Sequence, residues 1–349
     1  MDSNFSPKVS ILVPTYNEGT VILFKLENLN KLNYPKALTQ IIVVDSNSED
    51  STVEIVKRFA SDHPELGLEL VEDSQRIGKS AALNMALKYC RGEVVAVSDA
   101  DCFWPADILL KALPFLSDPK VGAVTGPKTL LNREQSWSTK TEDSYLSSMN
   151  LMKLGESKTS STLFFEGGFS AYKREAIQSF DPYATGSDDC GTIISLTEKD
   201  LRAILVPDAS FFTAFPVSWR ERVSMKMRRA NQLGRVFSKY LTLLLNRRIR
   251  GSKRTIIPSI FTYLFSPVFF ILLLPVTALL IIRFPYFAAL LLLFLVPKIG
   301  GPLIEASQSF IILVLGYIGA ASRKSSMKWQ KPADRLVLTS EMLRTRHLI

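Results

Sequence analysis

The stretch VSILVPTYNE at residues 9–18 gives the first indication of the fold. It begins with an almost continuous apolar run and ends in a polar loop, as expected of a strand buried on both faces of a sheet. Further strands are predicted at Gln40–Val44, Gly67–Glu72 and Glu93–Val97, with helices between them at Val21–Leu29, Thr52–Phe59 and Ser80–Cys90. This alternation predicts an α/β fold whose mostly parallel sheet carries helices on both faces. Ligands bind such sheets at the carboxyl ends of the strands, so we expect the chemistry in the loops that follow them.

The pattern changes after about residue 120. Val121–Thr125 predicts a strand, Ser138–Leu154 a helix, and Glu166–Arg174 and Leu201–Pro207 short strands or loops. Val217–Leu245 predicts a long helix with apolar residues at three- and four-residue steps and basic residues elsewhere. A basic amphipathic helix before an apolar region is typical of one lying on a membrane surface, and the alternative is a helix packed on the soluble domain.

The charges are distributed unevenly. The chain has 42 Lys and Arg against 33 Asp and Glu, a net charge of +9. From Ile256 to Ser322, however, the only charged residues are Arg283, Lys298 and Glu305, which excludes a wholly soluble protein. The basic residues cluster just before this region, so we interpret the positive charge as favouring membrane association and not as a nucleic-acid-binding surface.

Three apolar segments, Ser259–Ile282, Phe284–Pro297 and Pro302–Ala321, predict three membrane helices. Because basic residues flank the region on both sides, two spans with a re-entrant middle segment are the alternative. No signal peptide is predicted, so the catalytic part is expected on the cytoplasmic face. The expected domains are a catalytic domain (1–216), an interfacial helix with a basic linker (217–255), a membrane domain (256–322) and a basic tail (323–349).

Several classes of site are excluded. The sequence has two histidines and three scattered cysteines without a CxxC pair, which argues against a histidine zinc site, a Ser-His-Asp triad and a disulfide framework. Gly78-Lys79-Ser80 resembles the end of a Walker A loop, but position 73, where that motif needs glycine, is Asp. No GxGxxG motif is present, which argues against a dinucleotide-dependent dehydrogenase.

The strongest sign of chemistry is Ser98-Asp99-Ala100-Asp101, directly after a predicted strand. On extended backbone, residues two apart point to the same side, so both carboxylates are expected to face one cation. Mn²⁺ or Mg²⁺ held in this way keeps positions open for the phosphates of a nucleotide. The alternative for a lone pair of acids is a solvated acidic turn.

Four segments together resemble the nucleotide-binding half of a family-2 glycosyltransferase with a GT-A fold, which is Rossmann-like. They are VPTYNE (13–18), VVDSNSEDST (43–52), RIGKSAALNMAL (76–87) and SDADC (98–102). The resemblance implies a nucleotide site made by Pro14, Thr15, Tyr16, Glu18, Asp45, Lys79 and Asp99, and a metal site made by Asp101 and Asp99. Asp45 is followed by Ser46 where the family usually has a second acid, which leaves the nucleotide preference open.

The resemblance continues on the acceptor side. Glu166 and Gly167 lie in what looks like the acceptor loop of the family, and Asp188-Asp189 resembles its catalytic acidic pair, with Asp189 as the base. Arg228, Arg229 and Gln232 stand where many membrane members have a Gln-rich motif ending in Arg-Trp, and the tryptophan is missing here. Arginines at these positions are suited to bind a phosphate of the acceptor or of the diphosphate, although membrane-surface electrostatics would also explain them. Trp329 and Arg335 loosely resemble a cytoplasmic gating segment of the family.

These features predict an inverting, metal-dependent enzyme at the membrane. It would move a hexose of the mannose or glucose type from a GDP- or UDP-linked donor to a lipid-linked acceptor, such as dolichyl or polyprenyl phosphate or a glycan on it. Its other expected partners are membrane lipids. A processive polysaccharide synthase is the nearer alternative, and a non-catalytic, nucleotide-sensing membrane scaffold is the more distant one.

Overall fold

The computed structural model describes residues 5–74, 78–321 and 338–349. Its centre is a seven-stranded sheet with the strand order β3-β2-β1-β4-β8-β6-β9. These strands are β1 (Val9–Thr15), β2 (Thr39–Asp45), β3 (Leu68–Glu72), β4 (Val94–Val97), β6 (Val121–Thr125), β8 (Ser170–Lys173) and β9 (Arg202–Leu205). β8 runs antiparallel to both neighbours, and every other pair in this sheet is parallel. The prediction of a mixed, mostly parallel α/β sheet is confirmed.

Helices cover both faces of this sheet, because successive side chains of its strands point to opposite sides. Ile11 and Val13 of β1 pack in one apolar cluster with α1 (Ile22–Asn30), α2 (Thr52–Asp62) and α4 (Ile108–Ala112). Leu12, between them, packs in a second cluster with α3 (Lys79–Ala86) and α6 (Cys190–Glu198). The continuous apolar runs in the sequence therefore reflect strands that are buried on both sides.

A second, three-stranded sheet lies beside the carboxyl ends of the main strands. Its order is β5 (Cys102–Phe103), β10 (Phe211–Thr213) and β7 (Lys128–Leu130). The sequence did not predict these strands, since runs of two or three residues are too short to show a period of two. Through them, residues that follow β4 come to lie next to residues more than a hundred positions later in the chain.

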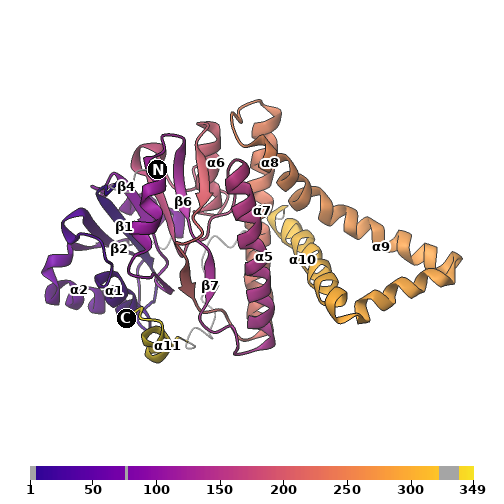
Figure 1. Cartoon of the computed structure of the whole chain (residues 1–349), viewed down its shortest axis with the longest axis horizontal. Coiled ribbons are helices and arrows are strands. Elements are labelled where there is room, and N and C mark those ends of the chain that lie inside the picture. The colour runs from indigo at the N-terminus through magenta and orange to yellow at the C-terminus, as the bar shows by residue number, and fades with distance from the viewer. Residues whose placement is uncertain (1–4, 75–77, 322–337) are drawn as a thin grey trace.

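Two long helices, α5 (Trp137–Thr159) and α7 (Trp219–Leu245), stand beside each other at the edge of the sheet domain (Figure 1). α7 buries Val236, Phe237 and Tyr240 in an apolar cluster that also contains Ile194 of α6. This face agrees with the alternative prediction of a helix packed on the soluble domain.

The apolar region projects away from the sheet (Figure 1). Residues 253–283 form one helical run made of α8 (Lys253–Ile260), a π-helical turn (Phe261–Phe265) and α9 (Ser266–Arg283). Only 6% of its most apolar window is buried, whereas the core helix of a soluble protein would be mostly buried. The chain continues through a 3₁₀ segment, η6 (Pro285–Leu295), and returns along α10 (Pro297–Ala321).

The prediction of three membrane helices is not confirmed. Among the described residues, Lys253–Arg283 alone is long and apolar enough to cross a membrane. The predicted middle span forms the 3₁₀ segment, and the described apolar stretch of α10 is Ala306–Ile318.

α10 lies directly against α7. A Cβ atom added to Gly316 of α10 would lie 2.6 Å from Cβ of Ala230, and one added to Gly234 of α7 would lie 2.7 Å from the Tyr317 ring. Small residues thus allow the two helices to approach closely, as in helix pairs within membranes. Trp329 and Arg335, with the rest of 322–337, lie outside the described residues, and α11 (Ser340–Thr345) follows them.

Candidate active site

A cavity of about 470 Å³ opens between the strand ends of the main sheet and the helices α5 and α7. Among the residues lining it are most of the predicted site residues: Lys79, Asp99, Asp101, Glu166, Gly167, Asp188, Asp189, Arg228, Arg229 and Gln232. They come from α3, the loop after β4, the loop before β8, the loop before α6, and α7. The structure therefore brings the predicted metal, catalytic and acceptor residues to one place.

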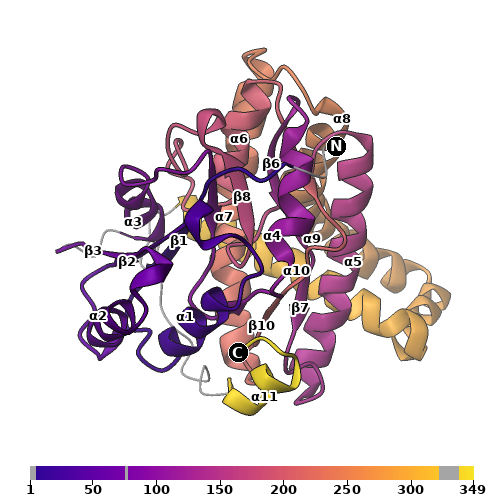
Figure 2. The ribbon, with the colours of Figure 1, turned by 60° about the vertical axis from the view of Figure 1, so that its left-hand side comes forward.

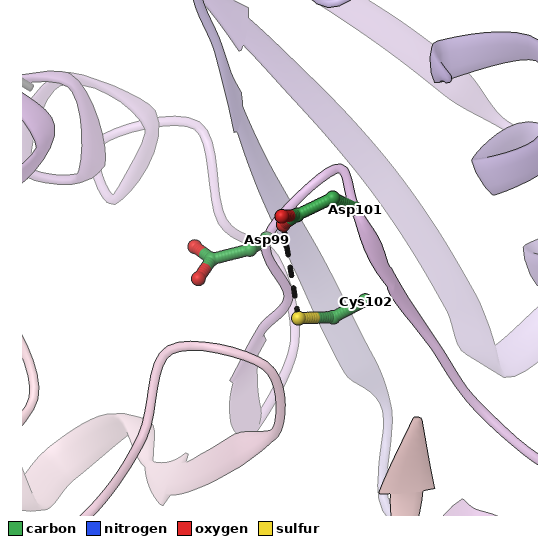
Figure 3. Close-up of side chains that lie close together, drawn as sticks. All are labelled: Asp99, Asp101 and Cys102. Carbon is green, nitrogen blue, oxygen red and sulfur yellow. Dashed lines mark hydrogen bonds between the residues drawn. The ribbon is translucent and has the colours of Figure 1, made fainter. Parts of the chain in front are cut away.

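Asp99 and Asp101 lie on a tight turn directly after β4 (Figure 3). The amide of Cys102 donates a hydrogen bond of 3.2 Å to the carbonyl of Asp99, which closes the turn. The extended backbone expected from the sequence is therefore wrong, because β4 ends at Val97. The acids remain close all the same, and oxygens of both and the sulfur of Cys102 lie within 4.8 Å of one another.

The two carboxylates suit a hard divalent cation. Mn²⁺ and Mg²⁺ bind carboxylate oxygens and keep positions for water and phosphate, which matches two acids facing an open cavity. Burial, together with Asp101 and Asp99, raises the pKa of the Cys102 thiol well above its usual range. A protonated thiol is a weak ligand, so the carboxylate oxygens would form the donor set for a cation.

Lys79, at the start of α3, connects the two acidic pairs of the cavity. Its ammonium lies 2.6 Å from Oδ1 of Asp99 and 2.9 Å from Oδ2 of Asp188. Burial lowers the pKa of Lys79, but Asp188 and Asp99 raise it well above the usual range, so the side chain stays charged. Gly167 packs over this contact, and a Cβ added there would lie 2.3 Å from the ammonium, so a side chain at this position would displace Lys79 or Asp99.

Asp188 and Asp189 are placed differently although they are adjacent. Burial, with Asp189 and Asp99, raises the pKa of Asp188 to about 6 against the opposing effect of Lys79. Asp189 is the N-cap of α6, and its Oδ1 accepts hydrogen bonds from the Ser187 hydroxyl at 2.5 Å and the Cys190 amide at 2.6 Å. In the described part of the chain, no hydrogen bond reaches its second oxygen, Oδ2.

The loop that carries these acids is held by a residue that the sequence analysis missed. Asp181 accepts hydrogen bonds from the amide and the hydroxyl of Thr185, at 2.9 and 2.7 Å, and from the amide of Gly186 at 2.7 Å. Gly186 has a φ of +85°, which glycine adopts without strain. Gln232 of α7 donates to the carbonyl of Gly186, so this predicted acceptor residue holds the loop before α6 in place.

Glu166 is surrounded by cations that the sequence analysis also missed. Its two oxygens lie 2.5 Å from Nζ of Lys153 and 3.2 Å from Nζ of Lys128. Burial opposes ionisation, but Lys153, Lys128 and Arg229 lower the pKa of Glu166 far below its usual range. Nothing in the local sequence marks these lysines, because Lys153 looks like an ordinary charge on α5 and β7 was not predicted.

Arg229 links the cavity to a buried charge between α5 and α7. Its guanidinium lies 3.6 Å from Glu142, which is fully buried and also lies 3.6 Å from Arg222. Burial lowers the pKa of Arg229, but Glu142 and Glu166 raise it, so the arginine stays charged. Arg228 lies one residue earlier on α7 and lines the cavity as well.

The remaining predicted nucleotide residues, Pro14, Thr15, Tyr16, Glu18 and Asp45, do not line this cavity but cluster at the ends of β1 and β2. Asp45 is 2% exposed. Its oxygens accept hydrogen bonds from the Thr15 hydroxyl at 3.0 Å and from the hydroxyl and amide of Ser48 at 2.6 and 2.8 Å. Asp45 therefore organises the loop that would receive a nucleotide. Arg76 and Ile77 of the third motif lie outside the described residues.

Comparisons with known proteins agree with this geometry. Residues 10–180 match the family model described as "Glycosyl transferase family 2". A beta-monoglucosyldiacylglycerol synthase of Trichormus variabilis is 37% identical over 134 residues, which are 38% of this chain and 29% of that protein. An N-acetylglucosaminyltransferase of Rhizobium meliloti is 28% identical over 64% of this chain and 54% of its own length. The matches thus cover at most about half of these relatives.

A solved structure agrees over nearly the whole chain. The mannosyltransferase PcManGT from Pyrobaculum calidifontis, in complex with GDP-Man and Mn²⁺, superposes with a TM-score of 0.79 at 32% sequence identity. The superposition covers 93% of this chain and 89% of that one, so it includes the region after the sheet domain. With the α/β fold, the paired acids after β4 and these similarities, the chain belongs to glycosyl transferase family 2.

Proposed function

We propose that this protein transfers a hexose from a nucleotide sugar to a lipid-linked acceptor at the cytoplasmic face of a membrane, with inversion at the anomeric carbon. The observation that carries this proposal is the single cavity that unites Asp99 and Asp101 with Asp188, Asp189 and the arginines of α7. These residues would supply cation ligands for the donor diphosphate, a general base, and positive charge for an anionic acceptor. A GDP- or UDP-linked mannose or glucose fits this scheme, and the GDP-Man bound to PcManGT supports the donor class.

On the donor side, Asp99 and Asp101 would hold Mn²⁺ or Mg²⁺. A bound divalent cation would neutralise the charge that develops on the leaving diphosphate. Lys79 supplies a positive charge that stays in place, because Asp99 and Asp188 keep it ionised and fixed. The loops after β1 and β2, held together by Asp45, would receive the nucleoside.

On the acceptor side, Asp189 would act as the general base. An acceptor hydroxyl oxygen forms a bond to the anomeric carbon while the bond from that carbon to the diphosphate breaks. The hydroxyl proton passes to Asp189, and the nucleoside diphosphate leaves with the bonding electron pair. If the acceptor is already a phosphate anion, no proton has to be removed, and Asp189 would position it instead.

The lipid nature of the acceptor is inferred from the surroundings of the cavity. Arg228 and Arg229 offer permanent positive charge to a phosphate, and Met149 and Leu233 add apolar walls. α7 also packs on α10, next to the exposed apolar helix at 253–283, which is suited to the membrane. The relative named as a beta-monoglucosyldiacylglycerol synthase further supports a lipid acceptor.

A transfer assay tests this proposal. The full chain, purified in detergent, is incubated with Mn²⁺, a panel of radiolabelled nucleotide sugars, and polyprenyl phosphate or diacylglycerol. Label in the organic phase is expected for one donor and acceptor pair. A long water-soluble product would indicate a processive synthase, and no Mn²⁺-dependent transfer or hydrolysis with any donor would favour a non-catalytic scaffold.

An Asp189→Asn variant tests the base. It should bind Mn²⁺ and nucleotide normally and transfer to a hydroxyl about 10²–10⁴ times more slowly. Undiminished transfer to a hydroxyl would remove Asp189 from this role. Undiminished transfer to a phosphate acceptor alone would identify the acceptor as an anion.

A further inference from the structure

Residues 338–349 follow the apolar region in sequence but pack on the sheet domain near its N-terminal elements. Figure 1 shows α11 on the sheet domain, below α1 and away from α9 and α10, and Figure 2 shows it below β10 as well. Leu338, Leu343 and Leu348 are 9%, 0% and 2% exposed and belong to the apolar cluster formed around β1 and α1. The segment is therefore part of the core of the catalytic domain.

Asn28 of α1 joins this segment to Trp104, which follows the turn that carries Asp99 and Asp101. This turn is called the metal-binding turn after its predicted role. Its Nδ2 donates to the carbonyl of Leu348 at 2.7 Å and to the carbonyl of Trp104 at 2.8 Å. Its Oδ1 accepts from the amide of Trp104 at 2.9 Å. Asn28 is 1% exposed, so these hydrogen bonds are shielded from solvent, and the loss of one partner would be costly.

Trp104 also contacts the residues that surround the turn carrying Asp99 and Asp101. The fully buried indole donates from Nε1 to the carbonyl of Gly168 at 2.7 Å. The neighbouring Gly167 accepts a hydrogen bond of 2.9 Å from the amide of Asp99. Lys25, one turn before Asn28 on α1, donates to the carbonyl of Cys102 at 2.7 Å and lies 4.6 Å from the indole centroid.

The segment also contacts the site by two other routes. Leu338 is one of the residues lining the cavity. The guanidinium of Arg346 lies 5.2 Å from the ring of Phe212 on β10, which pairs with Phe103 of β5, directly after the metal-binding turn. Thus residues 338–349 touch α1, β10 and the cavity, which together surround this turn.

We propose that residues 338–349 are a positioning element of the active site, which holds the turn carrying Asp99 and Asp101 in its cation-binding geometry through Asn28 and Trp104. The identity of the cation and of the donor rests on the proposed function. The segment acts through the turn that carries Asp99 and Asp101 and not as a catalytic group. Mn²⁺ affinity is therefore the direct readout.

Two adjacent positions on α11 give a matched test. Leu343→Asp places a carboxylate at a fully buried position and should release the segment, whereas Arg344→Asp places the same side chain at an exposed position. With GDP or UDP present, Mn²⁺ binding to the full chain is measured from the electron paramagnetic resonance signal of free Mn²⁺. Leu343→Asp should weaken it at least tenfold, and Arg344→Asp less than twofold. A lower melting temperature with unchanged Mn²⁺ affinity would show that the segment only stabilises the fold and would overturn the proposal.

A double-mutant cycle keeps the test informative if Leu343→Asp does not fold. The chain is ended after residue 337, alone and together with Asn28→Leu, which has a similar size but no hydrogen-bonding groups. If the segment acts through Asn28, ending the chain should weaken Mn²⁺ binding much less in the Asn28→Leu background than in the wild type. Additive losses would overturn this route.

The two proposals fail separately. Mn²⁺ titration needs no glycosyl transfer, so a wild type that transfers no sugar but binds Mn²⁺ with the expected variant dependence would refute only the proposed function. Normal transfer with a Mn²⁺ affinity that Leu343→Asp leaves unchanged would refute only the positioning role.

Discussion

The predicted donor and acceptor sides of the site bury their acids in different ways. On the predicted donor side, Asp45 is held by hydrogen bonds from two neutral residues, Thr15 at the end of β1 and Ser48 in the loop after β2. On the acceptor side, Glu166 is held by Lys128 and Lys153, and Glu142 by arginines of another helix. Asp45 thus relies on hydrogen bonds from neutral groups, whereas Glu166 and Glu142 rely on ion pairs with distant elements.

This difference indicates how each side should respond to change. A buried carboxylate that accepts hydrogen bonds can be replaced at moderate cost, since its neutral partners can turn or find other acceptors. A buried ion pair leaves an uncompensated charge when one partner is removed, which is much more costly. The region around Glu142 and Glu166 should therefore be more sensitive to the loss of one partner than the region around Asp45.

The largest effect is expected on the acceptor side, for Glu142→Ala. Arg222 is 0% exposed, and the change leaves its charge buried without this carboxylate. The free energy of unfolding should therefore fall by about 3–5 kcal/mol. Chemical denaturation of the purified protein in detergent measures it. Glu134→Ala is the control, because that side chain is 68% exposed and its removal should cost less than about 0.5 kcal/mol. Equal losses for the two variants would contradict the role of the buried pair.

Asp45→Asn should cost less, about 1.5–3 kcal/mol, because the amide group cannot accept all three hydrogen bonds that Asp45 receives. The same denaturation experiment measures this loss, and isothermal calorimetry with GDP and UDP reports whether the loop still receives a nucleotide. Asp62→Asn on α2 is the control, since its carboxylate is 62% exposed and makes one ion pair of 3.9 Å. A loss at Asp45 larger than that at Glu142 would reverse the comparison.

Gly316→Ala should disturb the packing of α7 on α10 and cost about 1–3 kcal/mol, because the new methyl group would press on Ala230 and force the helices apart. Gly155→Ala is a matched control on α5. An added Cβ there meets nothing within 4 Å, so the change should stabilise the helix by about 0.5–1 kcal/mol. Melting temperatures in detergent should move in opposite directions, and a shift in the same direction would mean that the close approach of the helices is not required.

The last prediction concerns Asp188, whose contribution to stability changes with pH. Its pKa of about 6, against an ordinary 3.8, means that the native state keeps a proton that the unfolded chain has lost. Asp188 therefore contributes stability below pH 4 that is lost as the pH rises to about 6, at up to about 1.4 kcal/mol per pH unit. The difference in unfolding free energy between the wild type and Asp188→Asn, measured from pH 4 to 7, should show this slope. Parallel profiles would show that Asp188 ionises normally.

Much of the donor side could be predicted because its residues are close in sequence to the strands that position them. The loops after β1, β2 and β4 follow apolar runs that are recognisable by themselves, and parallel strands carry such loops to one edge of the sheet. The geometry of the metal-binding turn was predicted less well, since β4 ends at Val97 and the turn begins before Asp101.

The structure of the apolar region, in contrast, could be predicted only in part. Apolar composition indicated three segments but carried no information on how the chain bends between them, and the middle segment became a 3₁₀ turn between α9 and α10. The contact of α10 with α7 depends on Gly316 and Gly234, whose importance appears only when the two helices are placed together.

The sequence by itself determined the α/β class, the family and the acids at the strand ends, because strand burial and loop motifs are local patterns along the chain. Tertiary structure alone decided which charges meet. It placed Lys128 and Lys153 on Glu166, Lys79 between Asp99 and Asp188, and residues 338–349 beside the metal-binding turn. Pairs between residues far apart in the chain leave no periodic trace, since each partner alone resembles an ordinary surface charge or an ordinary apolar residue.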